Sequence, residues 1–232
     1  MRSVSTSHPR AVQLDSLGFK VLSYLESQEA VKDLDLITKD GILPHEIALW
    51  EKKNVPYLMS PDLKAFYSAF NGFLLRWSSE IGYNKVPVGE MRVNSIDAFI
   101  RIPIDGRFVT SELMQAGVSP PDPSTCAAFL LDSFCEYGHV VIICRPPSRV
   151  GSVLEPEIWF QDLSAKWHFM CSSFKQYLRI MFLHLGISGW QMAFTSDGLP
   201  LWTQQWMKLF CKERLCIDLH NHASQILPSN SK

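Results

Sequence analysis

The residues best suited to chemistry lie in one short C-terminal segment that combines thiols, imidazoles and a carboxylate. They are Cys211, Cys216, Asp218, His220 and His222. Thiolates and imidazoles are the ligands that zinc prefers in proteins. Four residues separate the two cysteines, whereas a spacing of about two residues is the stronger zinc signal. The segment therefore allows two interpretations: a zinc-binding cluster, or two thiols on a final helix followed by two solvated histidines.

A second set of residues, Asp162, His168 and Ser172, has the side-chain types of a hydrolase triad. The sequence contains no G-x-S-x-G motif and no other reason to place these side chains together. We interpret them as an aspartate at a strand end, a loop histidine and a serine at a helix N-terminus. Glycine-rich phosphate-binding motifs are also missing from the sequence. We therefore predict no catalytic residue, no cofactor site and no metal site, with the zinc cluster as the alternative.

Aromatic residues dominate the segment 157–206, which contains five of the seven tryptophans: Trp159, Trp167, Trp190, Trp202 and Trp206. A buried large aromatic side chain removes about 150–250 Å² from water, so such a segment builds a core or contacts a partner. Trp159 and Trp167 follow a strand pattern and are predicted to be core. Tryptophan is enriched at binding hot spots. We predict a partner-binding role, with core burial as the alternative, for Trp190, Phe194, Trp202 and Trp206.

The composition is that of a globular chain with a sizeable core. Hydrophobic residues make up 47% of the 232 positions, charged residues 19%, and the net charge is −1. Such a charge provides no long-range attraction to nucleic acid or to an anionic membrane. No apolar run approaches the roughly 18–20 residues that span a bilayer, and the first ten residues do not resemble a secretory signal. The six cysteines are therefore expected to be reduced thiols in a cytoplasmic protein.

Helices are predicted in the first third of the chain and again in the last. Apolar spacing predicts a helix over 11–29, and prolines at helix starts predict helices over 44–53 and from Pro61 onward. Ser60 is the expected N-cap of the last of these, and Asn71-Gly72 its end. In the final third we expect a helix from Ser172 or Ser173 to Gly186, a short amphipathic piece around Trp190, and a helix that begins at Pro200.

Extended runs separate the two helical regions. Strands are predicted over 31–38, 73–78, 86–88, 126–134, 139–145 and 157–161. Residues 103–125 show no clear pattern. The order predicts an α+β fold in which a mostly antiparallel sheet is flanked by N-terminal and C-terminal helices. We expect a disordered N-terminus over 1–10, a single domain over 11–212 with a helical final third, and a polar tail over 213–232.

Two blocks of the sequence resemble a known family. Residues 50–96 contain Trp-Glu-x-Lys-Asn, Pro-Asp-x-Lys-x-Phe-Tyr, Asn-Gly-Phe and Asn-Ser-Ile, and residues 157–206 contain Glu-Ile-Trp-Phe, Trp-His-Phe, His-Leu-Gly and Ala-Phe-Thr-Ser. Both blocks resemble the non-catalytic second subunits of the tubulin polyglutamylase complex. The segment from Pro61 to Gly72 also resembles the wider SUKH superfamily, in which a Pro-x-x-Phe/Tyr helix ends in Asn-Gly.

The resemblance implies a SUKH-like fold and a chain that is not an enzyme. The implied role is that of a scaffold, which positions a tubulin-tyrosine-ligase-like catalytic subunit, among other subunits of the complex, for glutamylation of tubulin tails. Contact with tubulin and microtubules is then indirect. The implied locations are the cytoplasm and cytoskeleton, including the centrosome or centriolar region and the ciliary basal body. The alternatives are a stand-alone SUKH-type binding module with an unrelated partner and a zinc-binding protein.

Overall fold

The computed structural model describes residues 20–109, 113–114, 116–146 and 156–226. The predicted disordered segment 1–10 and much of the predicted helix 11–29 lie outside these ranges. The longer helices are α2 (Val21–Ser27), α3 (Pro44–Lys53), α4 (Pro61–Ala69), α6 (Phe174–Leu183), α7 (Leu201–Phe210) and α8 (Lys212–Ile226), with the 3₁₀-helix η1 (Trp190–Phe194) between α6 and α7. None of the helices in these ranges is long and apolar enough to cross a bilayer.

The strands form two sheets. Strands β1 (Val31–Asp40), β2 (Phe70–Ile81) and β3 (Asn84–Val93) make a three-stranded sheet in chain order. The second sheet is six-stranded, in the order β4-β6-β7-β8-β9-β5, with β4 (Arg101–Ile102), β5 (Arg107–Phe108), β6 (Ala127–Cys135), β7 (Gly138–Cys144), β8 (Glu157–Asp162) and β9 (Lys166–Cys171). All neighbouring strands pair antiparallel except β5 with β9.

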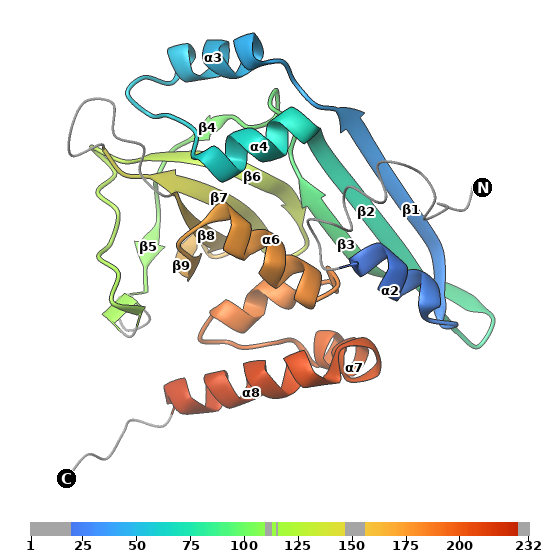
Figure 1. The fold of residues 1–232 in the computed structure, drawn as a ribbon. Coiled ribbons are helices and arrows are strands. Elements are labelled where there is room, and N and C mark those ends of the chain that lie inside the picture. The colour runs from blue at the N-terminus through green and yellow to red at the C-terminus, as the bar shows by residue number, and fades with distance from the viewer. Residues whose placement is uncertain (1–19, 110–112, 115, 147–155, 227–232) are drawn as a thin grey trace.

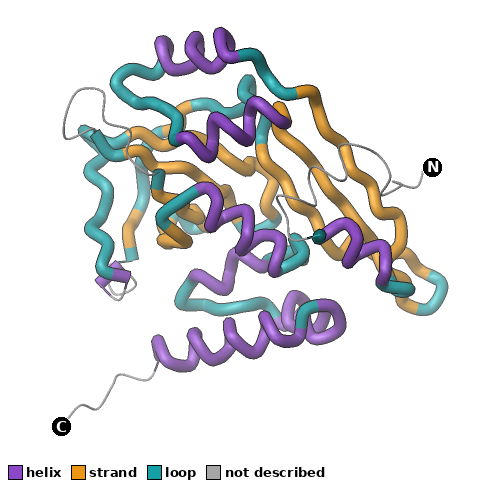
Figure 2. The backbone as a smooth tube through the Cα atoms, viewed as in Figure 1, coloured by secondary structure: helices purple, strands orange, loops and turns teal. Residues whose placement is uncertain are grey.

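The predicted α+β class with mostly antiparallel strands is therefore confirmed, although the strands divide between two sheets. In Figure 1, α4 and α6 lie in front of the sheets, while α7 and α8 lie beyond α6 toward the C-terminus. Figure 2 shows the same separation between helical and strand layers. Strands β6, β7 and β8 match the predicted runs closely, whereas β9 has no counterpart among the predicted elements.

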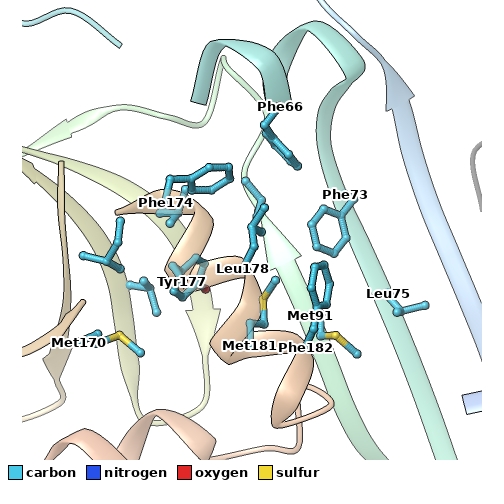
Figure 3. Close-up of a cluster of buried hydrophobic side chains, with 14 of the residues drawn as sticks. Phe66, Phe73, Leu75, Met91, Met170, Phe174, Tyr177, Leu178, Met181 and Phe182 are labelled. Atoms are coloured by element: carbon cyan, nitrogen blue, oxygen red, sulfur yellow. The ribbon is translucent and has the colours of Figure 1, made fainter. Parts of the chain in front are cut away.

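The main core lies between α6 and the sheets. The apolar residues of α6 recur at helical spacing and are buried: Phe174, Tyr177, Leu178, Met181 and Phe182. Figure 3 shows these side chains meeting those of α4 and β2. The Phe174 ring lies 5.1 Å from that of Phe66, and the Phe182 ring 6.2 Å from that of Phe73, measured between centroids. The apolar residues at helical spacing on α6 thus form one face that packs against both α4 and β2.

The six-stranded sheet is buried on both faces. Val140, Ile142 and Phe160 join the main core, and their neighbours along the strands form a second cluster, which includes Val141, Ile143, Trp159 and Trp167. Because side chains on both faces of these strands are buried, the strand sequences are continuously apolar and do not alternate with polar residues. The predicted core placement of Trp159 and Trp167 is confirmed. Phe108, from the stretch without a clear pattern, supplies part of the cover, because it packs against both indoles.

Two boundary predictions are wrong. Helix α4 begins at Pro61 as expected but ends at Ala69, and β2 follows directly at Phe70. Asn71 and Gly72 therefore lie in β2 and do not cap a helix. The amide oxygen of Asn71 accepts a hydrogen bond of 2.8 Å from the Ile96 N–H. Gly72 has φ +77°, and a Cβ there would lie 2.6 Å from the Val93 carbonyl oxygen. The pair thus permits a close backbone approach between β2 and the end of β3.

The predicted polar tail is the other difference. Most of 213–232 forms α8, which buries Leu215 and Asp218. Leu215, Asp218 and His222 lie at helical spacing and share a face. A polar composition conceals this amphipathic pattern, because the carboxylate of Asp218 becomes buried only against His184, the residue that follows α6.

Candidate functional site

Helix α7 presents two different faces. Its inner face is buried and consists of Thr203, Trp206, Met207 and Phe210. The Phe210 ring lies 4.8 Å from the Trp77 ring of β2, and the Thr203 hydroxyl donates a 2.6 Å hydrogen bond to the Ser188 carbonyl oxygen. These contacts hold α7 against the three-stranded sheet and against the segment that precedes η1.

The outer face of α7 carries three large apolar side chains beside the polar Gln205, and it is uncovered within the described residues. We define the α7 face as Leu201, Trp202, Gln205 and Leu209. Trp202 is 43% exposed, and Leu201 and Leu209 are 77% and 72% exposed. The Trp202 ring meets the buried Trp206 edge-on at 5.5 Å. The helix therefore holds a large apolar side chain at the surface in a defined position, which is the property of an interface anchor.

The other predicted partner-binding residues lie deeper. Trp190 is 1% exposed and stacks on His184 at 4.8 Å. Phe194 is half-buried with its ring 6.2 Å from Trp190. Trp206 is 5% exposed, and its Nε1 has no hydrogen-bond partner in the described part of the chain. For Trp190 and Trp206 the structure shows the core alternative, so Trp202 is the member of the set with a broadly accessible ring.

A buried polar network fixes α8 to α6. His184 Nε2 lies 3.0 Å from Asp218 Oδ2, and His184 Nδ1 lies 2.7 Å from the Ile180 carbonyl oxygen. Arg214 also donates to Asp218. Burial raises the pKa of Asp218, but the hydrogen bonds and charges of His184 and Arg214 outweigh burial and lower that pKa below its usual 3.8. Sequence reasoning missed this network, because His184, the residue after α6, and Asp218 of α8 are 34 positions apart.

The proposed zinc ligands do not assemble. The Asp218 carboxylate contacts His184 Nε2 at 3.0 Å, and His222 Nε2 lies 2.9 Å from the Ser196 carbonyl oxygen. Burial raises the pKa of the Cys211 thiol to about 12, which disfavours the thiolate that binds metal. Cys216 and His220 are exposed on α8. Across the ranges that the structure covers, no three His, Cys, Asp or Glu side chains come close enough to hold a metal ion.

Part of the hydrolase-like trio does meet. His168 Nε2 lies 3.1 Å from Asp162 Oδ2, and both side chains are largely buried. His168 is a strand residue of β9, so its predicted loop position is wrong. Asp162 also accepts hydrogen bonds of 2.8 and 2.9 Å from the Ser164 and Lys166 amides, which fixes the β8–β9 turn. The Ser172 hydroxyl instead donates to Gln176 Oε1 at 3.2 Å, which leaves the pair without a nucleophile from the trio.

The chain is similar to known proteins over most of its length. The human protein named tubulin polyglutamylase complex subunit 2 is 29% identical over 211 residues, which cover 85% of this chain and 70% of the human one. The rat and mouse proteins of that name are each 30% identical over 223 residues, covering 85% of this chain and 71% of theirs. No family model matches the chain. No solved structure matches it.

Proposed function

The chain belongs to the family of tubulin polyglutamylase complex subunit 2, and we propose on this basis that it is a scaffolding subunit without catalytic activity of its own. Its proposed partner is a tubulin-tyrosine-ligase-like catalytic subunit, held within the complex together with the other subunits. In this proposal tubulin is reached through the complex, and the chain acts in the cytoplasm and on the microtubule cytoskeleton, including the centrosome and ciliary basal body.

The observation that carries the proposal is the α7 face. Trp202 and Leu209 lie on the solvent side of a helix whose other side is packed against the core. Exposed tryptophans at the centre of an apolar surface are frequent interface anchors, because one side chain removes a large area from water with little loss of conformational freedom. A partner that covers this face gains binding energy without any rearrangement of α7.

The placement of the histidine–carboxylate pairs supports a non-catalytic role. Among the described residues, His168 and His184 are the histidines with carboxylate partners, and their side chains are 1% and 0% exposed. A general base must reach the proton that it abstracts from a substrate. Both rings are instead enclosed by packed side chains, where they join β8 to β9 and α6 to α8. These pairs therefore act as structural links between elements.

A scaffold of this kind acts by effective concentration. If one subunit binds both the ligase and a component that carries tubulin, the second encounter becomes intramolecular. The gain requires no acid–base group on the scaffold. It requires a stable docking surface and a rigid body behind it, and the packed inner face of α7 provides that rigidity.

The test is co-purification of this chain with a tagged tubulin-tyrosine-ligase-like subunit. Trp202→Ala should reduce the captured amount about tenfold or more, the effect of losing an interface hot spot of roughly 2 kcal/mol. The matched control is Leu49→Ala, an exposed apolar residue on α3. Thermal unfolding should be unchanged in both variants. Equal capture by Trp202→Ala, or glutamylation of tubulin by the purified chain alone, would contradict the proposal.

A further inference from the structure

A hollow lies on the three-stranded sheet at the ends of β1 to β3. Its volume is about 240 Å³. Side chains alternate across a strand, so Leu74 faces away from the core that Phe73 and Leu75 help to form. Helix α7 packs on the core side through Trp77, which places the hollow and the α7 face on opposite sides of β2.

The walls of the hollow are held by hydrogen bonds. Asn94 is buried, and its amide donates to the carbonyl oxygens of Leu130 at 3.0 Å and Ala98 at 3.4 Å. Asn71 accepts from the Ile96 amide, as described above. Gly72 adds no side chain between these walls. The hollow is therefore formed before any ligand arrives, which lowers the entropy cost of binding.

The chemistry of the lining is cationic and apolar. Lys39 and Arg92 line the hollow, and no acidic side chain does. Ile37, Leu74 and Arg92 are cross-strand neighbours, so apolar carbon lies beside the guanidinium group. Arg92 also binds Glu90 at 2.7 Å, whereas no ion pair joins Lys39 to another residue in the described ranges. The hydroxyls of Ser95 and Ser133 add neutral polar groups at the wall.

We propose that this hollow binds an acidic peptide. A glutamate carboxylate enters between Lys39 and Arg92, and its methylene groups lie over Ile37 and Leu74. Ammonium and guanidinium groups form charge-assisted hydrogen bonds with carboxylates. Two cations beside apolar carbon suit a side chain with an aliphatic stem, whereas a nucleic acid requires a broad basic footprint. The local charge pattern favours this ligand although the whole chain has a charge of −1.

The experiment uses the full chain and a fluorescein-labelled hexaglutamate peptide, with fluorescence anisotropy as the readout. Hexaglutamate should bind, and a hexaglutamine peptide of equal length should not. Lys39→Met should weaken binding about tenfold, the loss expected for one charge-assisted contact. Lys52→Met, on α3, is the matched control, because it removes the same charge from an exposed site outside the hollow. Its affinity should equal that of the unmodified chain.

A second variant separates occupation of the hollow from general electrostatics. Ala98→Trp fills the hollow from its exposed rim without changing charge and should also abolish binding. Urea unfolding of each variant checks that the fold is retained. The proposal is overturned if hexaglutamate does not bind, if hexaglutamine binds equally, or if folded Lys39→Met and Ala98→Trp bind as the unmodified chain does. None of these outcomes bears on capture of the ligase subunit by the α7 face.

Discussion

The indole Nε1 of Trp77 donates a 2.9 Å hydrogen bond to the carbonyl oxygen of Leu185. This bond joins the middle strand of the three-stranded sheet to the turn after α6, across 108 positions of sequence. Trp77 is fully buried, and Gly89 of β3 faces its ring. A Cβ at Gly89 would lie 2.0 Å from Nε1 and 2.7 Å from the same carbonyl oxygen. The hydrogen bond therefore depends on the absence of a side chain at position 89.

Gly89→Ala should destabilise the protein by about 1–3 kcal/mol, the usual cost of overpacking a filled core. The methyl group must displace either the indole or the turn that accepts its hydrogen bond. The measurement is the free energy of unfolding in urea. Gly82→Asn is the control, because nothing lies within 4 Å of a Cβ at Gly82 and asparagine tolerates its positive φ of 63°. Equal stability of Gly89→Ala and the unmodified protein would contradict the packing described for Trp77.

Asp218→Asn should lower stability by about 3 kcal/mol at neutral pH, because it removes one partner from a buried charged network. The folded-state pKa of Asp218 is lowered below 3.8 by His184 and Arg214. The ionised Asp218 carboxylate therefore contributes its full share of stability above the ordinary pKa of an aspartate. This contribution is lost as the pH falls through the lowered folded-state pKa. The difference in free energy of unfolding between Asp218→Asn and the unmodified chain should therefore decrease as the pH falls through that range.

Urea unfolding as a function of pH measures this difference. The control is Asp197→Asn, which changes an exposed carboxylate between η1 and α7. Its stability should remain within about 0.5 kcal/mol of the unmodified protein, as is usual for surface substitutions. A pH-independent gap for Asp218→Asn would show that the loss comes from packing and not from the ionised network.

Phe66→Ala should cost about 3–5 kcal/mol, as expected for truncation of a buried aromatic residue. Phe66 meets Tyr67, Phe70, Phe73 and Phe174, so the cavity would open where α4, α6 and β2 meet. Differential scanning calorimetry provides the measurement. Leu163→Ala, at an exposed site in the β8–β9 turn, should leave the transition unchanged. A loss below about 1 kcal/mol for Phe66→Ala would mean that this junction is not tightly packed.

Much of the fold is local in origin and was predictable. The spacing of apolar residues on α6, the proline at the start of α4, and the extended runs of β6 to β8 each depend on neighbours in sequence. The predicted helix end at Asn71-Gly72 is wrong, because the positive φ of Gly72 allows a close contact with the end of β3 and does not cap a helix. That contact involves residues some twenty positions away.

The candidate surfaces were also only partly predictable from the sequence. The tryptophan-rich segment indicated many aromatic side chains in the core or in partner contacts, and the sequence predicted the helix that begins near Pro200. Whether each ring packs inward or remains accessible depends on the neighbouring elements. Trp190 is enclosed by the rings of Tyr177, His184 and Phe194. Trp202, by contrast, lies one helical turn from the buried Trp206 and stays accessible. The cationic hollow combines residues from four separate strands and strand ends, so no single motif indicates it.

The sequence by itself determined the α+β class, the periodic helices and strands, and the large supply of aromatic side chains, because these follow from local backbone preferences and from hydrophobic spacing. Only the tertiary structure decided the division into two sheets and the conversion of a polar tail into α8. It also decided which indoles are buried, brought His184 to Asp218, and placed Lys39 and Arg92 around one hollow. Each of these features depends on burial and charge relationships between distant segments, which exist only after the chain has folded.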